Sequence, residues 1–121
     1  MFKANIPVVN LNTRIADDTL YKTFVGLENI NQGHDTAKAL FDGMDGKGKI
    51  FIIEGSTGAQ TSIDRVKGVE KAVAEYPGIE VVAQQSANYN RAEALNVVQN
   101  LLQAHPDVDA IFCCNDEMAL G

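Results

Sequence analysis

The sequence predicts an α/β fold in which a parallel sheet lies between two layers of helices. Short apolar runs, each typical of a strand, alternate along the chain with longer segments in which apolar residues recur every three or four positions, as they do on one face of a helix. The apolar runs are nearly continuous, which is typical of strands that helices cover on both faces. Strands and helices that alternate in this way form parallel sheets with right-handed crossovers.

The first half of the chain contains three predicted strands, at residues 6–11, 22–26 and 49–54. A helix is predicted between the second and the third. Asn29 is expected to cap this helix, with Gln32 as the reciprocal partner of a capping box. Its apolar stripe comprises Ile30, Ala37, Leu40, Phe41 and Met44.

The second half contains two more strand and helix pairs. A helix is expected to begin at or near Thr61, and its buried stripe comprises Ile63, Val66, Val69, Val73 and Tyr76. A strand at residues 79–83 follows. Asn90 and Glu93 form a capping box for the next helix, whose stripe comprises Leu95, Val98, Leu101 and Leu102. The last strand is predicted at residues 110–114. We expect residues 50–53, 79–82 and 111–114 to form neighbouring parallel strands with helices on both faces of the sheet.

The composition is that of one folded domain and limits the classes of ligand. The 121 residues are 45% hydrophobic and 21% charged, close to globular averages. The net charge of −6 argues against a nucleic-acid partner, because phosphate binding needs a basic surface. No apolar run approaches the ~20 residues that span a bilayer. Cys113 and Cys114 point to opposite faces of a strand, and the chain lacks a Cys and His spacing typical of metal sites, so we expect no metal and no other cofactor.

Polar side chains follow the predicted strands, at the edge where ligands of open parallel sheets bind. They are Asn12, Thr13 and Arg14 after the first strand, Arg65 in the helix after residues 49–54, Tyr89 after residues 79–83, and Asn115 after the last strand. A sugar hydroxyl both donates and accepts hydrogen bonds, so amides and arginines suit it, and an aromatic ring packs on the apolar face of the sugar. This set predicts a site for a neutral polyhydroxylated ligand.

Purely structural roles explain some of the same residues. Asn115 is also a good N-cap for a final helix, Tyr89 a plausible loop anchor, and Arg65 a surface residue paired with Asp64 or Glu70. A small α/β enzyme is the weakest hypothesis, because the loop at residues 55–58 lacks the Gly-Lys-Ser/Thr ending of a phosphate-binding loop and the sequence contains no paired catalytic groups.

Longer segments carry a family resemblance. The stretches IPVVNLNTR, KIFIIEGSTGAQTSIDRVKGVEKAV and NYNRAEALNVVQNLLQAHPDVDAIFCCNDEMALG together resemble sugar-binding proteins of the ribose-binding-protein class, which serve ABC transporters. The resemblance implies one lobe of a type I periplasmic-binding-protein fold, incomplete at both ends. Residues 1–26 would be the remnant of a first lobe with its crossing segment, and residues 27–121 most of the second, sugar-binding lobe.

The resemblance also implies roles for individual residues. Asn12 stands at a position that is usually Asp, and Thr13 at one that is usually Arg, for which Arg14 substitutes by a shift of one position. Arg65 matches the second basic position after the Gly-rich loop, Tyr89 an aromatic that is often Phe or Trp, and Asn115 the Asn of Asn-Asp-Glu-Met. Because Asn12 and Thr13 remove an acid and arginine pair that grips a pyranose, the ligand is left open as a monosaccharide or a polyol.

The implied function is the solute-binding component of a sugar ABC transporter, a non-enzyme in the periplasm or cell envelope with a membrane permease as its partner. The alternative is the effector-sensing core of a transcription regulator of the lac-repressor type. Regulators of this type contain a segment similar to NDEMALG, the last seven residues here. We also expect the strand at residues 111–114 to have an unpaired edge, which favours a homo-oligomer, most simply a two-fold dimer, and we expect this chain to bind sugar weakly.

Overall fold

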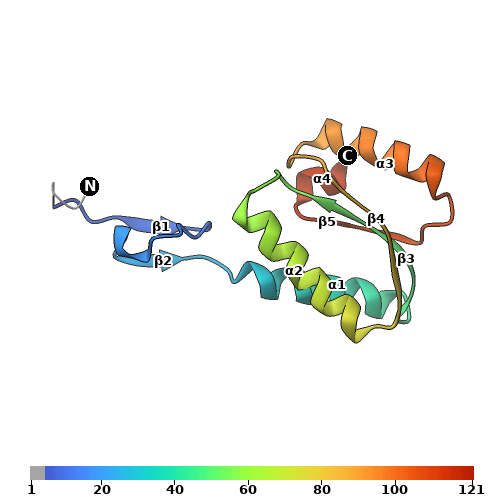
Figure 1. Cartoon of the computed structure of the whole chain (residues 1–121), viewed down its shortest axis with the longest axis horizontal. Coiled ribbons are helices and arrows are strands. Elements are labelled where there is room, and N and C mark those ends of the chain that lie inside the picture. The colour runs from blue at the N-terminus through green and yellow to red at the C-terminus, as the bar shows by residue number, and fades with distance from the viewer. Residues whose placement is uncertain (1–4) are drawn as a thin grey trace.

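The computed structural model describes residues 5–121 and contains two separate parallel sheets. The first sheet pairs β1 (Val9–Leu11) with β2 (Thr23–Val25), and a short 3-10 helix, η2 (Asp18–Leu20), lies between them. Both strands are shorter than predicted. In β1, Pro7 has no N–H to give to a strand ladder, so it does not extend the pairing. Figure 1 shows this pair apart from the rest of the molecule, in blue.

The second sheet has the strand order β4-β3-β5 and all of its pairings are parallel. Its strands are β3 (Lys47–Glu54), β4 (Gly78–Ser86) and β5 (Ala110–Cys113). The prediction that these three strands are parallel neighbours is therefore confirmed. Because β3 is the central strand, its residues Ile50 to Ile53 are at most 1% exposed, which accounts for the continuous apolar run in the sequence.

Within residues 5–121, four α-helices complete the fold, namely α1 (Asn29–Gly43), α2 (Gln60–Glu75), α3 (Arg91–Ala104) and the short α4 (Asp116–Leu120). Figure 1 shows α1 and α2 on one side of the three-stranded sheet and α3 and α4 on the other. The predicted three-layer αβα arrangement is thus confirmed.

Most of the predicted helical stripes are buried or partly buried, with Ala37, Phe41, Val66 and Val69 in the core. The prediction of burial is wrong for three residues of these stripes. Ile63 is 38% exposed, Leu95 44% and Leu102 39%. In α3 the face that packs on the core runs through Ala94, Val98 and Leu101. Leu95 and Leu102 lie one residue further along the helix, on its flank, and therefore remain accessible.

The predicted capping box at Asn29 is wrong. Glu28 occupies the N-cap position of α1 and makes no capping hydrogen bond with its side chain, while Asn29 lies inside the first turn. The Asn29 side chain accepts a hydrogen bond from Arg65 of α2 instead. A contact between distant elements has therefore replaced the local capping interaction.

The capping box at Asn90 is half formed. The Asn90 side chain caps α3 by accepting from the backbone N–H of Glu93. The Glu93 carboxylate accepts from the Asn88 side chain rather than from the backbone of Asn90, whose N–H donates to the Ala87 carbonyl. The reciprocal bond is absent because both of its groups have other partners.

Two glycines allow α1 and α2 to cross with their backbones in contact. A Cβ atom on Gly33 would lie 2.1 Å from the carbonyl oxygen of Arg65, and one on Gly68 would lie 2.1 Å from the carbonyl oxygen of Ile30. No side chain fits at either position without moving a backbone. The closeness of this crossing brings Arg65 next to the first turn of α1.

A histidine joins the same two helices at their surface. His34 of α1 lies between two carboxylates, with Nε2 2.9 Å from Glu75 Oε1 and Nδ1 3.0 Å from Asp35 Oδ1. The hydrogen bond to Asp35, followed by that to Glu75, raises the pKa of His34 above its ordinary value of 6.5. The protonated ring, which donates from both nitrogens, is therefore favoured in the folded chain.

This cluster predicts a pH dependence of stability. The stabilising contribution of His34 is fully present below pH 6.5, the pKa in the unfolded chain, and is lost as the pH rises through the raised pKa of the folded chain. We expect the urea midpoint of unfolding to fall as the pH rises above about 6.5, and His34→Gln to flatten this fall. An NMR titration of His34 supplies its pKa directly, and an unchanged pH profile in the variant would contradict the assignment.

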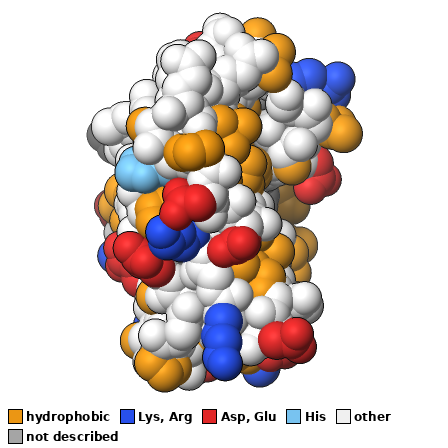
Figure 2. Space-filling view, turned by 90° about the vertical axis from the view of Figure 1, so that its right-hand side faces the viewer, with side chains coloured by type: hydrophobic (Ala, Val, Ile, Leu, Met, Phe, Trp, Pro, Cys, Tyr) orange, Lys and Arg blue, Asp and Glu red, His pale blue; other side chains and the backbone are white. Residues whose placement is uncertain are grey.

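The exposed surface is chemically mixed. On the face shown in Figure 2, acidic and basic side chains lie among one another and hydrophobic side chains form patches between them. Within residues 5–121, none of the helices has the length and apolar character required to cross a bilayer.

Candidate functional site

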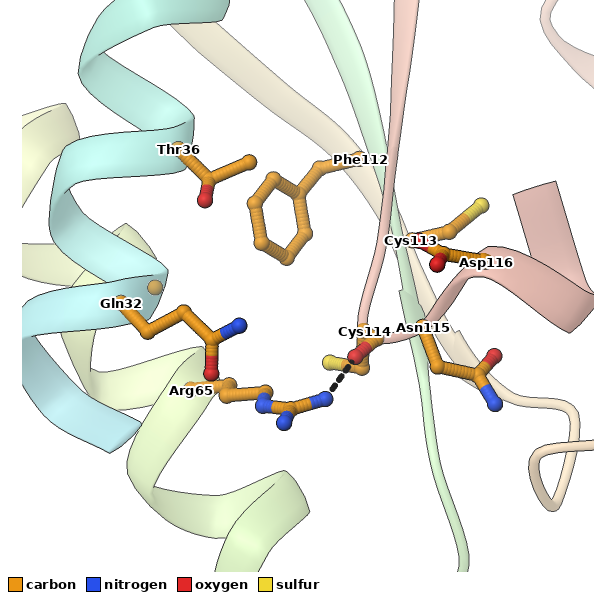
Figure 3. A pocket seen from close by; sticks show the side chains of 9 residues that line it. Gln32, Thr36, Arg65, Phe112, Cys113, Cys114, Asn115 and Asp116 are labelled. Atoms are coloured by element: carbon orange, nitrogen blue, oxygen red, sulfur yellow. Dashed lines mark hydrogen bonds between the residues drawn. The ribbon is translucent and has the colours of Figure 1, made fainter. Parts of the chain in front are cut away.

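A cavity of about 340 Å³ opens where α1, α2 and the carboxyl end of β5 meet. Gln32, Gly33 and Thr36 line it from α1, Arg65 lines it from α2, and residues 112–116 line it from β5 and the start of α4. Figure 3 shows these side chains around the opening, with Phe112 at its inner wall. The cavity lies at the sheet edge where the ligands of parallel α/β folds bind.

Arg65 links three parts of the chain at this cavity. Its Nε donates to Asn29 Oδ1 at 3.1 Å, and its Nη1 donates to the backbone carbonyl of Cys114, the contact drawn in Figure 3. The hypothesis of a surface residue paired with Asp64 or Glu70 is therefore wrong. The other N–H groups of the guanidinium have no protein partner within residues 5–121, so they are available to a ligand in the cavity.

Asn115 is both the N-cap of α4 and a lining residue of the same cavity. Its Oδ1 accepts a hydrogen bond of 3.0 Å from the backbone N–H of Met118, which confirms the predicted structural role. In Figure 3 its amide points away from Arg65, on the other side of Cys114. Arg65 and Asn115, two of the six residues predicted to form one site, thus line one cavity.

Tyr89, another of these six residues, does not line this cavity. Asn88 and Tyr89 have φ angles of 53° and 58°, an unusual left-handed conformation for two consecutive residues that are not glycine. This turn lays the Tyr89 ring on Gly55 at the end of β3, where a Cβ atom would be 2.0 Å from the ring atom Cζ. The ring is half-buried, and burial raises the pKa of Tyr89.

The hydroxyl of Tyr89 supplies a test of this packing. Its oxygen is buried and has no hydrogen-bond partner among the described residues. Because an unpaired buried hydroxyl costs about 1–3 kcal/mol, we expect Tyr89→Phe to leave the free energy of unfolding unchanged or to raise it. Urea denaturation measures this directly. A loss of stability would show that the hydroxyl has a partner, and Tyr21→Phe, at a partly exposed position before β2, is the matched control.

The residues after β1 lie on a loop that bends at Asn12, whose φ is 66°. Thr13 Oγ1 lies 3.1 Å from Thr61 Oγ1 at the start of α2, so this loop contacts a helix that packs on the three-stranded sheet. Arg14 forms an ion pair with Glu28 and its guanidinium lies 4.2 Å above the ring of Phe24. The structure therefore keeps Asn12, Thr13 and Arg14 outside the cavity that Arg65 lines.

Comparison with known proteins decides the family. A family model described as the periplasmic binding protein domain matches residues 3–121. The chain belongs to this family. This periplasmic binding protein domain is 36% identical over 116 residues to the ribose import binding protein of Bacillus subtilis, and the match covers 96% of the chain and 37% of that protein. The chain thus spans less than half the length of this relative.

Solved structures agree closely with the fold of this domain. An ABC transporter periplasmic solute binding protein from Actinobacillus succinogenes with bound D-allose superposes with a TM-score of 0.93 at 40% identity, over 99% of this chain and 44% of that chain. A solute binding protein from Bacillus halodurans with bound myo-inositol superposes with a TM-score of 0.91 at 31% identity. This match covers 98% of this chain and 42% of that chain. Type I lobe architecture and family membership therefore rest on both sequence and structure.

Sequence reasoning missed part of what lines the cavity of this domain. Gln32 and Thr36 lie on α1, which precedes β3, whereas the rule for open parallel sheets points only to residues that follow strands. The local pattern of the sequence places Gln32 in a capping box instead. The spacing of Gln32 and Thr36, four residues apart on one face of the helix, was the signal available in the sequence. Among the described residues no group of three His, Cys, Asp or Glu side chains is placed to hold a metal ion.

Proposed function

We propose that this chain is part of the solute-binding component of a sugar ABC transporter and that its cavity binds a monosaccharide or a polyol. The observation that carries the proposal is Arg65, which two protein contacts hold at the cavity while further N–H groups remain free. The named relatives support it, since their ligands are ribose, D-allose and myo-inositol. The same relatives are binding proteins, which favours this function over a transcription regulator and over an enzyme.

The chemistry of the cavity fits a neutral hydroxylated ligand. Arg65 is a pure donor, whereas the amides of Gln32 and Asn115 and the hydroxyl of Thr36 both donate and accept. The single arginine is balanced by the single carboxylate in the lining, that of Asp116. A ligand with several hydroxyls and no net charge can therefore satisfy these groups without leaving an unpaired charge.

The proposal includes the setting of the site. Residues 1–26 belong to a first lobe with its crossing segment, and residues 27–121 form most of the second lobe, consistent with the separation of the two sheets. A membrane permease is the partner and the periplasm or cell envelope is the location. Asn12, Thr13, Arg14 and Tyr89 contribute to the ligand site from outside the described cavity.

An NMR titration tests the function. We expect the backbone amide signals of Arg65 and Asn115 to shift when D-allose, ribose or myo-inositol is added, with a dissociation constant in the millimolar range, about −4 kcal/mol. Weak binding is expected because this chain carries only part of the site. 1,4-Dioxane, a six-membered ring that has no hydroxyl group, is the control. If none of the three compounds shifts these signals, the proposal is contradicted.

We also propose that the chain self-associates through β5. Within residues 5–121 this strand pairs with β3 on one side only, and an unpaired strand edge is a template for pairing with another chain. Two copies related by a two-fold axis would cover both edges at once. Sedimentation equilibrium measures the mass, and a monomer throughout the micromolar range would contradict this proposal.

A further inference from the structure

Gln32 has a buried group that the protein does not satisfy. Its side chain extends from the first turns of α1 toward Arg65 at the cavity (Figure 3). Its amide oxygen, Oε1, is shielded from solvent and has no hydrogen-bond partner among residues 5–121. Asn31, the preceding residue, is exposed and does not line this cavity. Figure 3 shows the Gln32 oxygen on the side of Arg65, so the unsatisfied group belongs to the cavity that Arg65 lines.

An unpaired buried acceptor costs about 1–3 kcal/mol, so native structures rarely keep one without a role. The neighbouring Arg65 offers donors only. A hydroxyl group serves both residues at once through a single oxygen, because that oxygen accepts from the guanidinium and donates its hydrogen to the amide oxygen. A carboxylate or a phosphate would satisfy Arg65 and leave the Gln32 acceptor unpaired.

We infer that Gln32 is a specificity-determining residue of this cavity, where its Oε1 accepts a hydrogen bond from a ligand hydroxyl that Arg65 holds. The inference rests on the proposed sugar-binding function and deepens it, because it names the group that requires a hydroxyl. A site built to bind a hydroxyl rejects an analogue that lacks it far more strongly than an apolar pocket rejects a change in size.

The side-chain amide signals of the protein supply the test. On titration with D-allose, we expect the Gln32 side-chain NH₂ signals to shift together with those of Arg65, and the Asn31 side-chain signals to stay in place. Gln32→Met, which keeps the length and removes the polar atoms, is expected to weaken D-allose binding at least about fivefold. Asn31→Leu is the matched control on the adjacent exposed position, and its affinity should equal that of the wild type.

Stability separates a ligand contact from a structural one. Gln32→Met is expected to keep or raise the urea midpoint without ligand, because it removes an unpaired buried acceptor. A lower midpoint with unchanged affinity would overturn the inference and make Gln32 a structural residue. If Arg65 signals shift while Gln32 signals do not and Gln32→Met binds like the wild type, the inference fails and the proposed function stands. If no signal responds to D-allose, ribose or myo-inositol, both fail.

Discussion

Gly68→Ala is expected to lower the free energy of unfolding by about 3 kcal/mol, at the upper end of the range for overpacking a core. The added methyl group would lie 2.1 Å from the Ile30 carbonyl oxygen and 2.5 Å from the His34 amide nitrogen, so two backbones must separate. Separation also loosens the packing of both helices on β3. Urea denaturation followed by circular dichroism measures the change.

Gly43→Ala is the control for this substitution. Gly43 is also helical, at the end of α1, but a Cβ atom there meets nothing within 4 Å. Alanine is the better helix former by about 1 kcal/mol, so this variant is expected to be as stable as the wild type or more stable. Equal losses of stability in the two variants would show that the helices do not cross as closely as described.

Arg65→Ala is expected to abolish detectable sugar binding. Loss of a charge-assisted contact in a desolvated site costs about 2–4 kcal/mol, which is comparable with the whole binding free energy of a millimolar ligand. The variant should also be less stable, because Asn29 Oδ1 and the Cys114 carbonyl lose their shared donor. These two contacts give Arg65 a structural role as well as a role in the proposed site.

Two further variants separate charge from geometry. Arg65→Lys keeps the charge, but the lysine ammonium group lacks the planar fork of donors with which arginine contacts two acceptors. We therefore expect this variant to bind sugar little better than Arg65→Ala. Lys71→Ala removes a cation from the exposed side of the same helix and should change neither the dissociation constant nor the urea midpoint. Calorimetry and NMR titration with D-allose give the affinities. Wild-type affinity in Arg65→Ala would remove Arg65 from the proposed site.

The features that sequence predicted well are those that depend on neighbouring residues. The central strand was recognisable because the run from Ile50 to Ile53 is apolar without interruption, and the start of α3 because Asn90 precedes Glu93 at capping spacing. The expected burial of Ile63 failed even though its spacing fits the stripe. Periodicity locates the apolar side of a helix, whereas the width of the covered strip depends on the partner that packs there.

The cavity was harder to predict because long-range contacts define it. Arg65 bonds to Asn29 and to Cys114, which are 36 and 49 residues away along the chain. The local pattern predicts that the Asn29 side chain caps α1, but this side chain accepts a hydrogen bond from Arg65 instead. Gly33 and Gly68 read as ordinary helical glycines, since only the crossing of α1 over α2 shows what they make room for. A single sequence contains the residues of such contacts but not their pairing.

The central position of β3 has a consequence for the order of folding. Lys47 pairs with Gly78, whereas Ile50 pairs with Ala110, so the pairing with β5 closes a chain loop about twice as long. The pairing with β4 therefore forms more readily, and β5 joins a sheet that is already part built. Until β5 arrives, the most apolar strand of the molecule has one bare edge. Refolding yields should accordingly fall as protein concentration rises, with residues 50–53 as the segment through which partly folded chains associate.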